Sequence, residues 1–185
     1  MFLFAGRLHS FIAASLTGLL FCSSATFAQQ TFKYSFQPPP GFKNIYKQSH
    51  EIEVGDVAGH KIRVAETNAD FASLGDAAPM FAGVRMKESR AYLASDYISG
   101  NGAASGYGIF LLENGDRIFM KMNILLHSKP GADGKPVSHF ILTYAITGGT
   151  GKFKGIRGVL RAGASTDLKT GVSGELTEGE YYFVD

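Results

Sequence analysis

The chain has 185 residues, a length that predicts one domain or at most two small ones. Its 18 basic and 16 acidic residues give a net charge of +2, which is too small to attract nucleic acid or an anionic membrane surface. Apolar residues make up 45% of the chain, with 23 glycines and no tryptophan. Such a composition is more typical of an all-β domain with many tight turns than of a helical one.

Residues 1–28 have the pattern of a signal peptide. Arg7 is their only charged residue, and the apolar run 11–21 is too short to span a bilayer comfortably. The stretch Ala-Thr-Phe-Ala at 25–28 offers a small-x-small cleavage site, so we place the cut before Gln29. We therefore expect an exported protein, periplasmic or secreted, that has no membrane span after processing.

A membrane anchor and a lipoprotein are the two alternatives for this segment. A lipoprotein site needs a small residue before its cysteine, whereas Phe21 precedes Cys22. Because Cys22 is the only cysteine, the processed chain has no disulfide, thiol nucleophile or cysteine metal site. Processing also removes Arg7, which lowers the net charge from +2 to +1, and we expect no nucleic-acid partner.

The processed chain begins with a polar segment, residues 29–48, that has Pro-Pro-Pro-Gly at 38–41. Proline cannot donate a backbone hydrogen bond, so this segment is a poor candidate for a central strand. We interpret it as an extended arm that covers a sheet edge or reaches a neighbouring subunit. One β-domain is then expected over residues 49–185.

The first elements of that domain are predicted from alternation and turn residues. Residues 50–54 and 60–66 alternate polar and apolar side chains on either side of a glycine-bounded turn, which predicts a hairpin. A loop with one helical turn is expected over 68–81, and strand-like stretches follow within 84–99. The glycine-rich residues 100–106 are interpreted as a flexible connection.

Asn114-Gly-Asp116, between apolar runs at 107–113 and 117–126, is the strongest hairpin signal in the chain. The two faces of the second run are Ile118, Met120, Met122, Ile124 and Leu126 on one side, and Arg117, Phe119, Lys121, Asn123 and Leu125 on the other. The remaining expected elements are a turn-rich loop at 128–137, strands at 139–146 and 153–162, a turn at 165–171 and a last strand at 173–184.

A glycine-dense corner joins the strands at 139–146 and 153–162. Gly148, Gly149 and Gly151 allow a tight reversal of the backbone. Gly155 and Gly158 fall inside the following strand pattern, where a missing side chain marks a bulge, a bend at a barrel corner or a close backbone approach.

This corner is not a phosphate-binding loop. Such a loop needs Ser or Thr after the lysine, and Phe153 follows Lys152. It also needs a glycine where Ile146 stands, and no helical pattern follows to supply an anion-binding N-terminus. We do not expect nucleotide binding.

The segment Ile146-Thr-Gly-Gly-Thr-Gly-Lys-Phe153, with Gly155 and Gly158 after it, resembles the glycine corner of the allene oxide cyclase and dirigent-like superfamily. The likeness is closest to small exported bacterial members. Over residues 52–184 it is limited to the spacing of the predicted strands. It implies an antiparallel eight-stranded barrel related in shape to lipocalins. Plant members are often trimers, so a homo-oligomer, dimer or trimer, is one expectation here.

The sequence itself predicts an all-β fold, because its strands have short connections and must bury their faces by closing into a barrel or stacking two sheets. The glycine corner favours a single antiparallel barrel of about eight strands, which is either packed solid or holds one small ligand. The resemblance implies that such a barrel holds a reactive apolar molecule in one conformation without a metal or redox cofactor. The corner itself is scaffold in those families.

Catalytic motifs are absent from the sequence. His9 lies in the signal segment, and His50, His60, His127 and His139 are isolated in sequence, which predicts surface histidines at strand ends rather than a metal site. We expect no metal and no cofactor.

Polar and tyrosine side chains inside the strand patterns are the candidates for a ligand site in the lumen. They are Glu88, Tyr107, Lys121, Asn123, Tyr144, Arg157, Arg161, Glu175 and Tyr181. A buried charge needs a partner, so an interior Arg–Glu pair would mark a site. The sequence leaves open which strand faces line the lumen, and a shift of one residue would turn every candidate outward.

Three functions follow as hypotheses. The first is an exported barrel that binds a small apolar or aromatic molecule in its lumen. The second is a cofactor-independent cyclase, isomerase or lyase that acts by positioning such a molecule. The third is a structural envelope protein with a packed barrel and apolar patches on its outer face.

Overall fold

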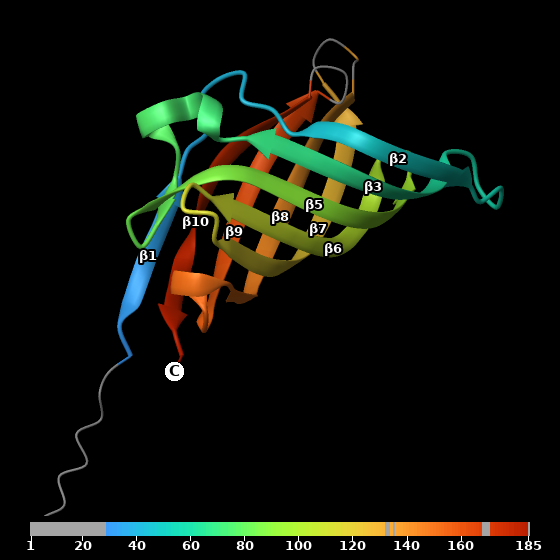
Figure 1. Cartoon of the computed structure of the whole chain (residues 1–185). Helices are drawn as coiled ribbons and strands as arrows, with labels where there is room; N and C mark the ends of the chain where they lie inside the picture. Colours follow the sequence, from blue (N-terminus) through green and yellow to red (C-terminus); the bar gives the residue numbers. More distant parts are fainter. Residues whose placement is uncertain (1–28, 132–133, 135, 168–170, 185) are drawn as a thin grey trace, which may run out of the picture.

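The structure is a computed structural model that describes residues 29–131, 134, 136–167 and 171–184 (Figure 1). The expected signal peptide, residues 1–28, lies outside the described residues. The strands are β1 Thr31–Phe36, β2 Ile45–Glu53, β3 His60–Asp70, β4 Met80–Phe81, β5 Val84–Ile98, β6 Asn101–Leu112, β7 Arg117–Pro130, β8 Pro136–Gly149, β9 Ile156–Asp167 and β10 Gly171–Phe183. Two short 3-10 helices, η1 Ala72–Ala77 and η2 Gly151–Phe153, complete the described elements.

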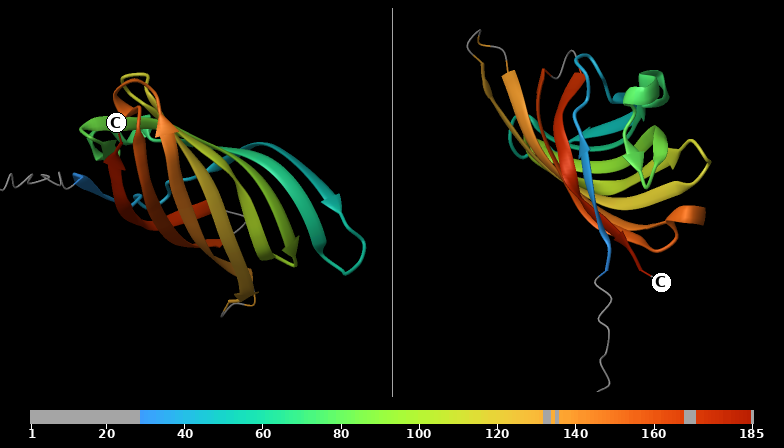
Figure 2. Two further views of the ribbon diagram at one scale, coloured as in Figure 1. Left: turned by 90° about the horizontal axis from the view of Figure 1, so that it is seen from below. Right: turned by 90° about the vertical axis from the view of Figure 1, so that its left-hand side faces the viewer.

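The strands form one antiparallel sheet in the order β1-β10-β9-β8-β7-β6-β5-β3-β2, with β4 paired to β5. The prediction of an all-β fold is confirmed. The sheet has ten strands rather than about eight, and it is not closed, because β1 and β2 are its two edges. It curves strongly, so that one face is concave and the other convex (Figure 2).

The segment 29–48, which we had interpreted as an arm, contributes to the sheet. Strand β1 pairs with β10 from Thr31↔Tyr182 to Phe36↔Thr177, and β2 begins at Ile45. The prolines are confined to the link between these two edge strands, where no ladder hydrogen bond is required of them.

Two segments that were expected to be connections are strands. Strand β6 begins at Asn101, and the turn before it is Ser99–Gly100, both with positive φ. A Cβ on Gly106 would lie 1.9 Å from the carbonyl oxygen of Tyr92. Glycine at that position therefore permits close packing of β6 on β5 and does not indicate flexibility. The loop expected over 128–137 is shorter too, because β7 runs to Pro130 and β8 starts at Pro136.

The alternation predicted for residues 117–126 is confirmed. Ile118, Met120 and Met122 are buried on the concave face, whereas Leu125 on the opposite face is 63% exposed. The predicted hairpin at Asn114-Gly-Asp116 joins β6 to β7, with Gly115 at φ 85°. Local patterns therefore give the strands and their faces correctly in this part of the sheet.

One end of the concave side is packed solid with apolar side chains. Phe81, Phe153 and Ile118 are fully buried. Ring contacts extend this core, with 5.2 Å between the ring centroids of Phe81 and Tyr181 and 6.3 Å between those of Phe153 and Phe183. We call this region the closed end.

The glycine corner covers the closed end. Gly151 opens η2 at φ 49°, and the Asp116 carboxylate accepts hydrogen bonds from the Lys152 backbone N–H at 3.1 Å and the Thr150 hydroxyl at 3.3 Å. The Lys152 ammonium in turn donates to the carbonyl oxygen of Ala82 at 2.8 Å. The corner is thus fastened to the β6–β7 turn and to the turn between β4 and β5.

Gly151→Ala should destabilise the protein more than Gly115→Ala does. Both glycines have positive φ, but a Cβ at Gly151 would lie 2.0 Å from Oδ1 of Asp116, whereas a Cβ at Gly115 meets nothing within 4 Å. Moving Asp116 aside would break its bonds to the corner, so we expect an additional loss of about 1–2 kcal/mol in the free energy of unfolding. Urea unfolding of the two variants measures it, and equal losses would contradict this role for Asp116.

Candidate functional site

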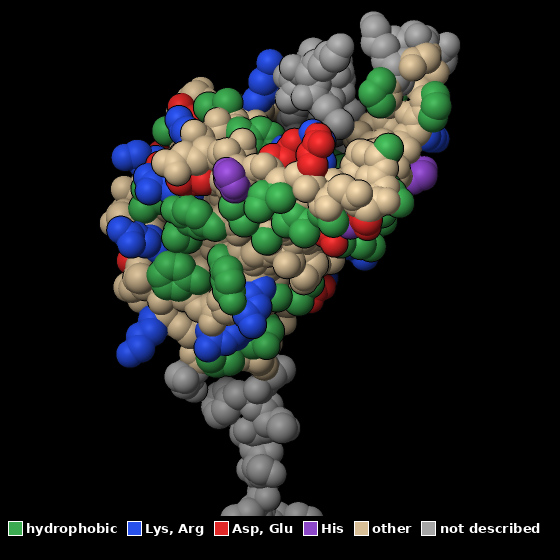
Figure 3. Space-filling view, turned by 90° about the vertical axis from the view of Figure 1, so that its right-hand side faces the viewer, with side chains coloured by type: hydrophobic (Ala, Val, Ile, Leu, Met, Phe, Trp, Pro, Cys, Tyr) green, Lys and Arg blue, Asp and Glu red, His purple; other side chains and the backbone are tan. Residues whose placement is uncertain are grey.

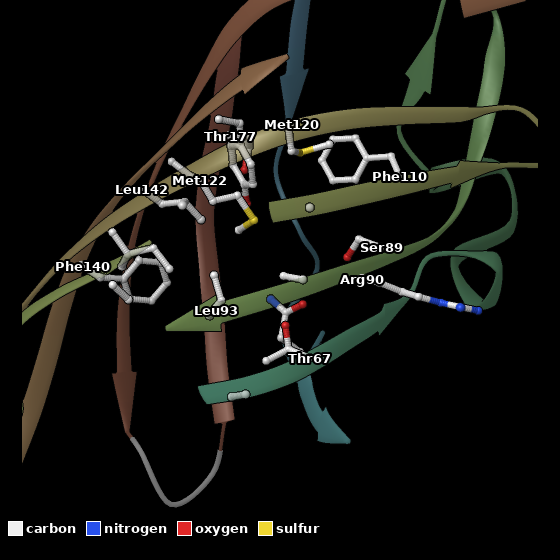
Figure 4. Close-up of a pocket in the computed structure, with 18 of the residues that line it drawn as sticks. Thr67, Ser89, Arg90, Leu93, Phe110, Met120, Met122, Phe140, Leu142 and Thr177 are labelled. Atoms are coloured by element: carbon white, nitrogen blue, oxygen red, sulfur yellow. The ribbon is translucent and has the colours of Figure 1, made fainter. Parts of the chain in front are cut away.

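The concave side of the sheet is hollow beyond the closed end. A cavity of about 210 Å³ lies between the strands, lined mainly by apolar side chains (Figure 4). Met120, Met122, Phe110 and Leu142 form much of the wall. They come from inward-facing positions of β6, β7 and β8, because successive residues of a strand point to opposite faces.

The link between β1 and β2 lies over one side of this cavity. Phe36, at the end of β1, and Phe42, in the link, both line it together with Phe71. The ring centroids of Phe42 and Phe71 are 4.7 Å apart, and those of Phe36 and Phe71 are 5.6 Å apart. This aromatic cluster fixes the link against the segment before η1, so the cavity is covered where the sheet edges do not meet.

Two phenols add polarity to the apolar lining. Tyr34 projects from β1 and Tyr144 from β8, and both line the cavity. Burial is the largest cause that raises the pKa of each phenol well above its ordinary value, and for Tyr34 the neighbouring phenols of Tyr144 and Tyr181 add to it. Both groups therefore remain protonated hydrogen-bond donors at any physiological pH.

Arg63 marks the opposite end of the cavity from the closed end. Its guanidinium lies 4.8 Å from the ring centroid of Tyr46 and donates to the Tyr46 hydroxyl at 3.1 Å. Tyr97 is also part of the lining. Burial raises the pKa of its phenol, and the positive charge of Arg63 partly offsets this effect. The cationic group is thus held at this end, the mouth of the cavity, against the Tyr46 ring.

Of the nine residues that the sequence suggested for a lumen site, Tyr144 lines the cavity. Tyr181 also faces the concave side, but it is 3% exposed at the closed end, and its hydroxyl accepts a hydrogen bond from the Ala82 N–H at 2.7 Å. The side chain of Glu175 lies outside the part of the molecule that the structure describes.

The other six candidates lie on the convex face. They are Glu88, Tyr107, Lys121, Asn123, Arg157 and Arg161. The strand phase explains this, since Lys121 and Asn123 alternate with the buried Met120 and Met122. These side chains therefore cannot contact a ligand in the cavity.

Two of the charged candidates, Arg161 and Glu88, form ion pairs on that outer face. Arg161 donates to Glu178 at 2.7 Å. Glu88 accepts hydrogen bonds from Arg90 and Asn68, and the bond from Arg90 is the main cause that holds its pKa below the usual range. Figure 4 shows the Arg90 side chain extending away from the cavity. The interior Arg–Glu pair that we had considered is not formed by these residues.

Several lining residues were not among the candidates. Tyr34 lies in the segment interpreted as an arm, although Phe32, Tyr34 and Phe36 alternate as in a half-buried strand. Arg63 falls in the predicted hairpin strand 60–66, where no pattern marks it as a site residue. The alternation of apolar residues on each strand was the signal that could have found most of the wall.

A metal site is not suggested by the geometry of the described residues, which contain no group of three His, Cys, Asp or Glu that could hold a metal ion. His60 contacts two carboxylates, Asp56 through Nδ1 at 2.5 Å and Asp96 through Nε2 at 2.8 Å. Because these contacts are on opposite sides of the ring, the three groups do not face one point. Within the described ranges, no helix is long and apolar enough to cross a bilayer.

Comparison with known proteins gives no relative from which a site could be transferred. The chain matches no protein-family model, no curated protein and no solved structure. The candidate site therefore depends on the geometry of the cavity alone.

Replacing Tyr34 and Tyr144 together by Phe should make the free energy of unfolding fall less steeply as the pH rises above 10. The unfolded phenols ionise near pH 10, whereas burial raises the folded-state pKa of both. A raised folded pKa stabilises the protein below pH 10, and this contribution is lost as the pH rises above it. Between pH 10 and 11 we expect the wild-type unfolding free energy to fall more steeply than that of the double variant, by about 2 kcal/mol per pH unit.

Urea unfolding at a series of pH values measures these slopes. Tyr107→Phe serves as the control, because this phenol is 62% exposed on the convex face. Identical slopes for the wild type and the double variant would show that the two phenols are not shielded from water.

Proposed function

We propose that this protein is an exported binding protein for a small apolar or aromatic molecule, which it holds in the cavity on the concave side of its sheet. The observation that carries the proposal is the cavity itself. A sheet of this size can bury its concave face completely, yet about 210 Å³ stays open beside a solid core. Apolar lining with a few polar groups is the usual chemistry of sites for small molecules.

We also propose that the chain is a distant member of the allene oxide cyclase and dirigent-like superfamily, with a fold of the same barrel type. The glycine corner at residues 146–158 and the single curved antiparallel sheet support this relationship. Export is supported by the charge and hydrophobicity pattern of residues 1–28.

The alternative of a cyclase, isomerase or lyase requires a charged or polar cluster inside the cavity. The arginine and glutamate candidates that the structure describes, Glu88, Arg157 and Arg161, lie on the convex face. Ligand binding needs no such cluster, and we therefore put it forward in preference to catalysis.

A role in assembly is the second candidate function, and the convex face favours it. Leu125 and Ile141 are cross-strand partners on β7 and β8 and are 63% and 64% exposed. Hydrophobic side chains are also prominent on the side of the molecule seen in Figure 3. Exposed apolar patches of this kind support self-association into a dimer or trimer, which is compatible with ligand binding on the concave face.

Ala91→Phe should abolish or strongly weaken binding of an aromatic probe, whereas Ala94→Phe should not. Both residues are on β5, but Ala91 lines the cavity and Ala94 is exposed on the convex face. We expect a phenyl ring at position 91 to occupy the space that naphthalene would fill and to weaken naphthalene binding at least about tenfold. Quenching of naphthalene fluorescence in a titration measures the affinity.

Circular dichroism and thermal unfolding of both variants control for folding. Failure of the wild-type protein to bind naphthalene, or equal binding by Ala91→Phe and wild type, would contradict a ligand site in this cavity. Native mass spectrometry of the processed protein, Gln29–Asp185, would in addition report the number of subunits and any small molecule that is retained.

A further inference from the structure

Three phenols converge on the concave side of the sheet from different strands. Tyr34 comes from β1, Tyr144 from β8 and Tyr181 from β10. Their rings belong to one aromatic cluster, because Tyr34 and Tyr181 both pack on Phe81, and Tyr144 packs on Phe110, whose ring centroid is 5.7 Å from that of Phe81. Tyr34 stacks on Phe81 with ring centroids 4.6 Å apart, so its position adjoins the closed end.

These three hydroxyls differ in their hydrogen bonding. Tyr181 accepts the N–H of Ala82 at 2.7 Å. Neither Tyr34 nor Tyr144 has a hydrogen-bond partner anywhere in the described part of the protein. Neither hydroxyl is sealed off, because among the described residues Nε of Arg85 is the one enclosed side-chain polar atom without a partner. The two hydroxyls therefore remain accessible from the cavity, where a ligand group can satisfy them.

Both partnerless hydroxyls belong to residues that line the cavity. Tyr34 is only 5% exposed, and Tyr144 keeps partial exposure at an inward-facing position of β8. A group placed in the cavity beside them could therefore take up hydrogen bonds that the protein itself leaves unused.

We propose that the ligand carries one uncharged oxygen, a hydroxyl or a carbonyl, which the phenols of Tyr34 and Tyr144 bind at the inner end of the cavity. This inference rests on the proposed function and specifies the chemical class of its ligand. Two phenols can donate to the two lone pairs of one carbonyl oxygen, or one can donate to a hydroxyl while the other accepts from it.

The rest of the lining argues for a neutral oxygen rather than an anionic one. The walls are apolar side chains such as Met120 and Phe110, together with neutral residues such as Thr67, Ser89 and Thr177. An ionised ligand group among them would need a cationic partner. Arg63 lies at the mouth, where it is engaged with Tyr46. A carboxylate would therefore be stabilised at the mouth and not beside the two phenols.

The arrangement also fixes the orientation of the ligand. With the oxygen at the phenols, the apolar body would extend along Met122, Leu93 and Phe140, which point into the cavity in Figure 4. Methionine side chains are flexible and polarisable, so they adapt to aromatic as well as aliphatic bodies. The hydrogen bonds would then select the ligand by its oxygen, while the walls tolerate variation in its shape.

The test compares naphthalene with 2-naphthol, which differ by one hydroxyl group. Titrations with the purified wild-type protein at neutral pH should show about tenfold tighter binding of 2-naphthol, because that hydroxyl satisfies two otherwise unpaired phenols. The double variant Tyr34→Phe/Tyr144→Phe should bind 2-naphthol and naphthalene with about equal affinity. Its affinity for naphthalene should differ from that of the wild type by less than about twofold. The Phe side chains preserve the ring packing, and Tyr107→Phe on the convex face should keep the wild-type preference.

The outcomes separate this inference from the proposed function. If naphthalene binds but 2-naphthol gains nothing, or if the double variant keeps the preference, the role of the phenols is overturned and the binding cavity stands. Binding of 2-naphthoate as tight as that of 2-naphthol, and sensitive to the double variant, would overturn the requirement for a neutral oxygen. Failure of every probe to bind would overturn both proposals.

Discussion

Strands β1 and β2 follow one another in the chain but lie at opposite edges of the sheet. Residues 37–44 must therefore cross between the two edges instead of making a tight turn. Prolines at 38–40 suit this crossing because they need no ladder partner, and the chain turns where the Phe42 N–H donates to the carbonyl oxygen of Pro39 at 3.1 Å. Phe42 anchors the crossing on Phe71. The cavity depends on this one constraint, since without the link the concave face would be open along its whole length between the edges.

The size of the inward-facing side chains explains why one end is solid and the other hollow. At the closed end the inward positions carry Phe, Ile and Tyr, as at Phe153 and Ile156. Farther along the strands the inward positions include small residues, such as Ala65, Ala91 and Ala104. The strands keep similar spacing throughout, so small residues leave volume that large ones would fill. The cavity is thus encoded in the sequence by residue size at alternate positions.

Much of the fold could be predicted from local pattern. The hairpin at Asn114-Gly-Asp116 and the two faces of β7 depend on turn chemistry and a period of two, and both are visible in a short window. The pairing of β1 with β10 joins residues nearly the whole domain apart, and no local signal specifies it. For that reason Tyr34 was placed in an arm, although its neighbours alternate as in a strand.

The site is harder to predict from the sequence, because most polar residues inside the strand patterns face outward. Lys121 and Asn123 share β7 with Met120 and Met122, and the more apolar face of an antiparallel strand is the one that is buried. Choosing the apolar face would have put those two outside and Tyr144, which shares its phase with Leu142, inside. The physical reason is that a charged side chain on the buried inner face is unfavourable unless an oppositely charged or hydrogen-bonding group lies beside it.

The distribution of charge also limits how this protein could recognise a ligand. Arg161 is paired with Glu178, Arg90 with Glu88 and Lys33 with Glu180, all on the convex face. What the inner cavity can offer is therefore apolar surface, shape and neutral polar groups, namely the two phenols and residues such as Thr67, Ser89 and Thr177. Apolar contacts discriminate weakly between molecules that differ by a methylene, whereas a buried polar group that would be left unpaired discriminates strongly. Selectivity in such a cavity must come mainly from its few hydroxyl groups, and its apolar walls would contribute affinity without much choice between ligands.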